Sequence, residues 1–214
     1  MNDRGAPFSM ISMKTVTLAF TGASGMPYGV RLLESLLAGK MRVYLLYSPA
    51  AQIVAQQEMG LALPSRTKEA QSFFREKYGV DENALKVFGR EEWFAPLASG
   101  SNPADAMVIC PCSMGTLGAV AAGLSDNLIE RAADVTLKEA RKLILVPRET
   151  PLSAIHLENM LKLSRAGTVI LPANPGFYHH PQTIQDLVDF VVARVLDHLG
   201  IPHRLVARWG NETG

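Results

Sequence analysis

The sequence predicts an α/β fold in which helices cover both faces of a doubly wound parallel sheet. Two observations lead to this prediction. Short runs of continuous apolar and β-branched residues, such as Arg42–Tyr47 (RVYLLY) and Lys142–Val146 (KLILV), are typical of strands buried on both faces. These runs alternate with longer segments of helical periodicity, which is the pattern of strand–helix–strand units. Small-residue loops follow several of the strands, which is where such a sheet binds ligands.

Composition favours one domain and excludes several classes of partner. The 214 residues are 48% hydrophobic, enough for one well-buried core. We expect a leader over residues 1–14, the domain over 15–200 and a tail over 201–214. The 21 basic and 20 acidic side chains give a net charge of +1, so the chain has no broad field for nucleic acid or an anionic membrane.

Cysteine usage and hydropathy predict a cytoplasmic protein. Cys110 and Cys112 flank a single residue, Pro111, which is too short a spacing for an ordinary disulfide. Without a nearby histidine to act as a base, they are better interpreted as buried thiols than as a nucleophile pair. The first fourteen residues lack the apolar core of a signal peptide, and no later run is long enough to span a bilayer.

The first unit is a strand, a tight turn and a helix within Val16–Val30 (VTLAFTGASGMPYGV). The strand stops at Thr21, and a helical pattern runs from about Pro27 to Gly39–Lys40. A turn of small residues lets the N–H groups of a helix N-terminus approach an anion such as a phosphate. A tight turn without any ligand is the alternative.

The remaining elements follow in chain order. We expect strands at Arg42–Tyr47, Val87–Phe88, Asp105–Cys110, Lys142–Val146 and Thr168–Leu171. We expect helices at Ala51–Gly60, Thr67–Tyr78, Leu117–Ala122, Leu128–Arg141, Ser153–Ala166 and Thr183–Leu199. Ser125, Asp126 or Asn127 can cap the helix that begins at Leu128. Together these elements predict a three-layer, Rossmann-like fold of the flavodoxin type.

Candidate binding residues gather after the strands, at what should be one edge of the sheet. They are small, hydroxyl-bearing, charged or aromatic: Gly22, Ala23, Ser24, Ser48, Ser113, Met114, Gly115, Thr116, Arg148, Glu149 and Tyr178. Backbone donors and hydroxyls suit a phosphate, Arg148 suits a phosphate or a polar ring edge, and Met114 suits an apolar face. The sequence therefore predicts a site for a flat, phosphorylated cofactor.

Several uninterrupted motifs resemble those of the flavin prenyltransferases, flavoproteins that make prenylated FMN. They are TGASGMPYG, CPCSMGTLGAVAAGLSDNLIERAADVTLKE, LVPRETPLS, LENM and PANPGFYHHP, in order from about Thr15 to Gly200. Related phosphopantothenoylcysteine decarboxylases carry a histidine in the first helix and a PAMN-type loop. This chain has Met26–Gly29 and PANPGFY at those places, which disfavours cysteine decarboxylation.

The resemblance implies a reaction and assigns residues to it. Reduced FMN, a co-substrate, would be joined at N5 and C6 to the dimethylallyl group of dimethylallyl monophosphate. FMN contacts map onto Gly22, Ala23, Ser24, Ser48, Ser113, Met114, Gly115, Thr116 and Arg148. Contacts to the substrate phosphate map onto Tyr178, Arg194, Arg131 and Lys138, some of them supplied by a neighbouring subunit. Catalytic roles map onto Ser24 and Glu58, which assist proton loss at C6, and Glu149, which protonates the departing phosphate or relays protons.

The same resemblance implies a homo-oligomer, a dodecamer being one candidate, and a partner decarboxylase that uses prenylated FMN. No metal is expected, because the chain lacks the Asp-Asp-x-x-Asp pattern that holds magnesium around a diphosphate. His179–His180 is better explained as loop structure than as a metal site.

Plainer interpretations remain open. By sequence alone, Arg131, Lys138, Arg194 and Glu58 are ordinary surface charges. Trp93 and Trp209 can line a prenyl pocket or simply pack, and packing is preferred for Trp93. The rival functions are an FMN-dependent decarboxylase acting directly on an aromatic or cysteinyl acid, and a flavin carrier that does not need Glu149, Lys138 or Arg194.

Overall fold

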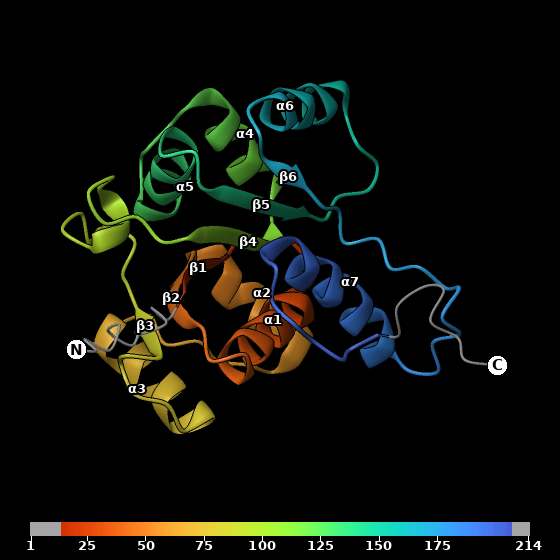
Figure 1. Cartoon of the computed structure of the whole chain (residues 1–214), viewed down its shortest axis with the longest axis horizontal. Coiled ribbons are helices and arrows are strands. Elements are labelled where there is room, and N and C mark those ends of the chain that lie inside the picture. Colours follow the sequence, from red (N-terminus) through yellow and green to blue (C-terminus); the bar gives the residue numbers. More distant parts are fainter. Residues whose placement is uncertain (1–13, 207–214) are drawn as a thin grey trace, which may run out of the picture.

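A computed structural model describes residues 14–206 of the chain. The predictions of a leader over residues 1–14 and a tail over 201–214 fall largely outside this range, as does Trp209. Helices lie on both faces of a central sheet (Figure 1), which confirms the predicted fold class.

All strands of the sheet are parallel, in the order β3-β2-β1-β4-β5-β6. Their bounds are Thr15–Phe20 (β1), Arg42–Tyr47 (β2), Leu85–Val87 (β3), Ala106–Cys112 (β4), Lys142–Pro147 (β5) and Val169–Ile170 (β6). This is the strand order of a Rossmann sheet, and without the short edge strand β3 it is the order of flavodoxin. The order reverses between β1 and β4, and the carboxyl ends of those two strands therefore flank the switch point, where such sheets bind ligands.

The helices have the bounds Met26–Ala38 (α1), Pro49–Met59 (α2), Thr67–Tyr78 (α3), Met114–Ala122 (α4), Leu128–Lys138 (α5), Ala154–Arg165 (α6) and Ile184–Leu199 (α7). A short 3-10 helix, η1, spans Pro96–Ala98. Hydroxyl or amide side chains cap five N-termini: Ser48, Ser113, Asn127, Ser153 and Thr183. Each accepts a hydrogen bond from a backbone N–H of the first turn, which is why these helices begin where they do.

Two apolar clusters form the core, one on each face of the sheet. Side chains alternate along a strand, so neighbouring residues serve opposite faces. Leu18 and Val108 join the cluster under α1, α2, α3 and α7, whereas Ala19 and Ile109 join the cluster under α4 and α5. All four are fully buried. This two-sided burial explains why the strands read as continuous apolar runs rather than as alternating ones.

Several boundaries differ from those predicted, and three of the differences have a clear physical cause. Strand β4 continues through Pro111 to Cys112, because Cys112 still pairs with Pro147 of β5. Helix α4 begins at Met114 rather than Leu117, since Ser113 caps it directly after the strand. Helix α5 ends at Lys138, and Ala140 takes a left-handed conformation with φ 52° that stops the helix before Arg141.

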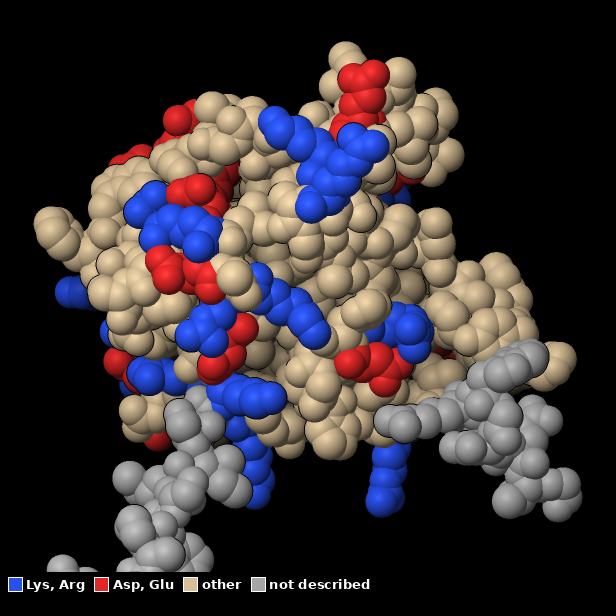
Figure 2. All heavy atoms as spheres, turned by 45° about the horizontal axis from the view of Figure 1, so that its top comes forward, with Lys and Arg blue, Asp and Glu red and all other residues tan. Residues whose placement is uncertain are grey.

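On the face drawn in Figure 2, charged side chains of both signs are interspersed around a broad uncharged area, as the near-zero net charge leads one to expect. Over residues 14–206, none of the helices is both long enough and apolar enough to cross a bilayer.

Candidate active site

The carboxylate of Glu58 lies at the N-terminus of α1. The Gly25 N–H donates to both of its oxygens, at 3.1 Å and 3.0 Å, and the Met26 N–H donates to Oε2 at 2.8 Å. Gly25 adopts φ 118°, a conformation that glycine reaches at little cost and that turns its N–H toward α2. A helix N-terminus attracts negative charge, so the anion held here is a side chain of the protein itself rather than the expected phosphate.

A buried threonine ties together the two strand ends at the switch point. The Thr21 hydroxyl donates to the Pro111 carbonyl at 2.8 Å and accepts from the Ser113 N–H at 2.8 Å. Thr21 is 1% exposed, so both bonds are shielded from water. They hold the loop Gly22–Ser24 against the start of α4, and two of the predicted FMN loops thus lie side by side.

Ser48 and Ser113 each cap a helix that starts at this edge. Ser48 accepts from the Ala51 N–H at 3.1 Å, and Ser113 accepts from the Thr116 N–H at 3.3 Å while its hydroxyl also pairs with that of Thr116 at 3.0 Å. A Cβ at Gly115 would meet no atom within 4 Å, among the described residues, so the first turn of α4 faces open space. A flat ligand can therefore approach this backbone closely.

Gly22 has a different reason to be glycine from the one expected. A Cβ there would lie 2.5 Å from the Cβ of Ala50 at the start of α2, which is too close for two carbon atoms. The absence of a side chain at Gly22 thus lets α2 pack beside β1. Ala23 is buried and Ser24 is exposed, so the Ser24 hydroxyl is the group that the loop presents outward.

Arg148 and Glu149 follow β5 at the same edge. The Nε atom of Arg148 is buried and has no hydrogen-bond partner among residues 14–206. A buried donor left unpaired costs free energy, so a ligand that accepts from it gains affinity. Glu149 is exposed, and within residues 14–206 its Oε1 accepts a local hydrogen bond of 3.1 Å from the Thr150 N–H.

Tyr178 and Arg194 lie on one side of α7. The Tyr178 ring meets the edge of Phe190, with centroids 5.6 Å apart. Arg194 is four residues after Phe190, so it projects from the same helix face about one turn (~5 Å) further along. The Arg194 Nη1 donates to Asp197 at 2.7 Å, and more than half of the arginine side chain is exposed.

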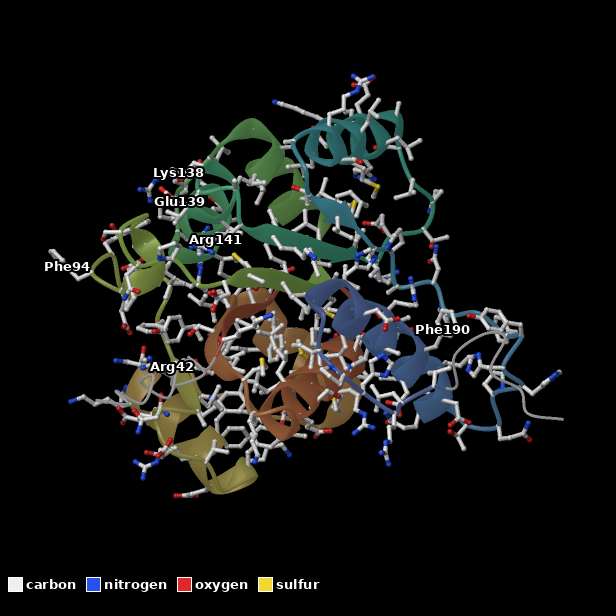
Figure 3. All side chains as sticks on the ribbon, in the orientation of Figure 1. Arg42, Phe94, Lys138, Glu139, Arg141 and Phe190 are labelled. Atoms are coloured by element: carbon white, nitrogen blue, oxygen red, sulfur yellow. The ribbon has the colours of Figure 1, made fainter. Side chains whose placement is uncertain are left out.

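Lys138 lies away from this edge of its own chain. Lys138 is the last residue of α5, close to where β5 begins, and therefore at the amino-terminal edge of the sheet. Figure 3 shows Lys138 beside Glu139, with which it forms an ion pair, on the opposite side of the molecule from Phe190. The Arg131 Nε donates to the Ala98 carbonyl of η1 at 3.0 Å, and its Nη1 donates to Asp134 at 2.8 Å. One chain alone does not bring Lys138 to Glu149.

The surroundings of Cys110 and Cys112 make their thiols unreactive. Both are free and buried. Burial raises the pKa of the Cys112 thiol to about 12 and also raises the pKa of Cys110, where the neighbouring Cys112 adds to the effect. Neither forms a reactive thiolate near neutral pH. This agrees with their interpretation as structural thiols.

Sequence reasoning missed Thr21 and Tyr28. Burial raises the pKa of Tyr28, and the charges of Cys110 and Glu58 add to the rise. In the sequence, the position of Tyr28 in the first turn of α1, directly after the small-residue loop, could have indicated that it lies near the site.

Trp93, which was expected to pack, is 45% exposed, and its neighbour Phe94 is fully exposed.

The donor set fits FMN better than a metal. Within residues 14–206, no three His, Cys, Asp or Glu side chains are grouped so as to hold a metal ion. The unpaired Arg148 Nε, the open backbone at Gly115 and the Ser24 hydroxyl instead suit a phosphorylated ring system.

Comparison with known proteins agrees with this arrangement. The family model described as "Flavoprotein" matches residues 6–196. The flavin prenyltransferase UbiX of Pseudomonas aeruginosa is 57% identical, over 95% of this chain and 97% of that protein. Among solved structures, AnUbiX (PadA1) in complex with FMN and dimethylallyl pyrophosphate aligns with a TM-score of 0.83 at 39% identity, covering 93% of this chain and 98% of that one. A dodecameric FMN-dependent UbiX-like decarboxylase from Escherichia coli O157:H7 aligns with a TM-score of 0.80 at 41% identity, covering 92% and 100%.

Proposed function

Since this chain belongs to the flavin prenyltransferases within the flavoprotein family, we propose that it transfers the dimethylallyl group of dimethylallyl monophosphate to reduced FMN. The 57% identity to a flavin prenyltransferase over nearly the whole chain is the observation that carries the proposal. The carbon–oxygen bond to the phosphate breaks as the prenyl group bonds to N5, which loses its proton. Closing the ring at C6 uses the prenyl double bond, which takes up a proton while C6 loses its own, so that phosphate is the other product.

The flavin supplies the two nucleophilic ring atoms, and the residues at the carboxyl edge of the sheet hold it. We assign binding of reduced FMN to the loops Gly22–Ser24 and Ser113–Thr116, with Ser48 and Arg148. The unpaired Arg148 Nε and the open space at Gly115 support this assignment. Ser24 lies next to Gly25, whose N–H binds the Glu58 carboxylate. We propose that Ser24 and Glu58 together accept the C6 proton.

Loss of phosphate leaves negative charge on oxygen, and cations stabilise it. We propose that Arg194, Arg131 and Lys138 stabilise this negative charge, that Tyr178 donates a hydrogen bond to the phosphate and that Glu149 donates a proton to it. Such a set would make the reaction independent of a metal. Because Lys138 lies at the opposite edge of its own chain from Glu149, we propose that a neighbouring subunit supplies it, together with Arg131 of the same helix.

A homo-oligomer is consistent with the surface of α6. Three large apolar side chains of this helix are exposed, namely Ile155, Leu157 and Leu161, at 68%, 52% and 50%. Exposed apolar groups concentrated on one helix are typical of a subunit contact. The dodecameric UbiX-like relative makes the same arrangement a candidate here. A cytoplasmic location and a partner decarboxylase that uses prenylated FMN complete the proposal.

The direct test is the mass of the flavin recovered after anaerobic incubation of the purified protein with FMN, reductant and dimethylallyl monophosphate, without added metal. We expect a flavin heavier by a five-carbon prenyl unit. A parallel reaction with the diphosphate establishes which leaving group the enzyme accepts. Unmodified FMN bound to folded protein would instead favour the carrier or the direct decarboxylase.

A further inference from the structure

The segment that follows α7 turns back along the end of that helix. Gly200 adopts φ 68°, a left-handed conformation that glycine takes at little cost and that ends the helix. The Ile201 N–H then donates to the Leu196 carbonyl at 3.0 Å, and the Ile201 side chain is buried. Further along, Leu205 packs against the apolar cluster under α1 and α7. His203 therefore lies between two apolar contacts that hold its segment against the protein.

The carboxylate of Asp197, in the last turn of α7, is shared by His203 and Arg194. The His203 Nε2 lies 3.2 Å from Asp197 Oδ1, and the Arg194 Nη1 donates to Oδ2 at 2.7 Å. The Leu205 N–H donates to the His203 Nδ1 at 3.4 Å, which leaves the ring proton on Nε2, where it donates to Asp197. Only 9% of the His203 side chain is exposed. Each oxygen of the carboxylate thus has a donor of its own.

This arrangement leaves one edge of the Arg194 guanidinium available. Within residues 14–206, Nη1 is the atom of this group that has a hydrogen-bond partner. The Nε and Nη2 atoms form the edge that can bind two oxygens of one anion, as the same edge of Arg31 does with Asp189 at 2.7 Å and 3.1 Å. More than half of the Arg194 side chain is exposed, so an anion can reach that edge.

We propose that Asp197 is a positioning residue for the allylic phosphate substrate: fixed by His203, it holds Nη1 of Arg194 and so presents the Nε–Nη2 edge of the guanidinium to the phosphate. The proposal rests on the proposed function, because it takes Arg194 to bind the substrate phosphate. An arginine that is held in one rotamer before binding loses less entropy when the phosphate arrives. An exposed ion pair contributes little to folding, so its effect should be on substrate binding rather than on unfolding.

Substituting Asp197→Asn tests this inference, since asparagine keeps the size of the side chain but has one acceptor oxygen for two donors. We expect the KM for dimethylallyl monophosphate to rise about fivefold, with FMN affinity and thermal stability unchanged, because the guanidinium is no longer held by a charge-assisted hydrogen bond. Glu69→Gln is the matched control. It removes an Arg66–Glu69 pair of the same i,i+3 spacing on the exposed surface of α3.

A double-mutant cycle shows whether Asp197 acts through Arg194. Arg194→Met removes the guanidinium and should raise the same KM. If the carboxylate acts by holding that guanidinium, Asp197→Asn adds little to the KM of the Arg194→Met enzyme.

A second pair of variants covers the case in which Asp197→Asn does not fold. His203→Phe keeps a ring but has no N–H to donate to Asp197, and it should raise the KM for dimethylallyl monophosphate. His203→Gln places an amide N–H near the position of Nε2 and should restore most of the value. His198→Phe is the control, because the structure gives the His198 side chain no hydrogen bond within residues 14–206.

The outcomes separate the two proposals. A KM that falls in Asp197→Asn would show that the carboxylate competes with the phosphate for Arg194, and would overturn the positioning role. Fully additive effects of Asp197→Asn and Arg194→Met would overturn it too, as would an unchanged KM in both Asp197→Asn and His203→Phe. An unchanged KM in Arg194→Met would show that Arg194 does not bind the substrate phosphate, which removes the basis of the role. A wild-type protein that forms no prenylated flavin would overturn the proposed function itself.

Discussion

Arg148 is the residue at which burial and unmet hydrogen bonding coincide at the sheet edge. Its Nε is shielded from solvent and lacks a partner within residues 14–206, whereas the other candidate cations already form ion pairs. Hydrogen bonds to charged groups stabilise a complex by about 1.5–3 kcal/mol when the pair is desolvated. The unmet donor therefore points to binding of an anionic or carbonyl-bearing ligand.

We predict that Arg148→Met weakens FMN binding about tenfold or more, because that range of free energy corresponds to at least one order of magnitude in Kd. Fluorescence titration with FMN measures the change. Arg141→Met is the matched control, since Arg141 is exposed and lies near Lys138, away from Phe190 (Figure 3). Equal affinities of the two variants would remove Arg148 from the flavin site.

At the scale of elements, helices α1, α2 and α4 begin within a few residues of the carboxyl ends of their strands, and they differ in what their N-termini hold. The N-terminus of α1 binds Glu58, whereas α2 and α4 are capped by Ser48 and Ser113. The α1 amides of Gly25 and Met26 are already occupied by a carboxylate. The open backbone of α4 at Gly115 is consequently the better place for a ligand to approach.

We predict that Gly115→Ala separates folding from flavin binding. Alanine has a higher helix propensity than glycine, by up to about 1 kcal/mol, and the Cβ would meet no protein atom in the described structure, so thermal stability should stay the same or rise. The added methyl group should nevertheless weaken FMN binding, because it fills the space through which the ring reaches the backbone.

Gly118→Ala in the same helix is the control for this prediction. Its Cβ would make only ordinary contact, 3.5 Å from the Asn159 Nδ2, on the side of α4 that faces α6. Thermal unfolding and FMN titration should show similar stability for both variants and weaker binding for Gly115→Ala alone. A Gly115→Ala protein with wild-type affinity would place the flavin elsewhere.

At the scale of the whole molecule, the groups assigned to one phosphate lie at opposite edges of the sheet. Lys138 ends α5 beside the start of β5, whereas Glu149 follows the end of the same strand. A six-residue strand separates the two edges by about 20 Å at 3.3 Å per residue. A site that uses both residues must therefore combine two subunits.

We predict that two inactive variants complement each other. Lys138→Met and Glu149→Gln should each abolish most prenyl transfer, and co-expression of the two variants should restore part of it. In a randomly mixed oligomer, about a quarter of the shared sites receive an unaltered Lys138 from one subunit and an unaltered Glu149 from the other. Prenylated flavin formed per subunit is the measurement. As a control, the two variants are purified separately as assembled oligomers and then mixed. If co-expression restores no activity, each chain carries a complete site of its own.

The sequence by itself determined the fold class and most elements. Continuous apolar runs such as those of β2 and β5 indicate strands that are buried on both faces. Capping residues such as Asn127 indicate where helices begin. Both signals can be detected in the sequence because they depend on local periodicity and local backbone hydrogen bonding. The loops at the carboxyl edge were predictable for the same reason, since in a parallel sheet every strand delivers its following loop to one edge.

Only the tertiary structure decided which groups meet. The carboxylate of Glu58 reaches Gly25 across 33 positions of sequence, and Thr21 reaches Ser113 across 92. Likewise, no local pattern shows that His203 lies back against the end of α7 and shares Asp197 with Arg194. Sequence periodicity records what each residue does within its own element, whereas contacts between elements depend on how helices dock on the sheet, and that is set by the packing of the whole core.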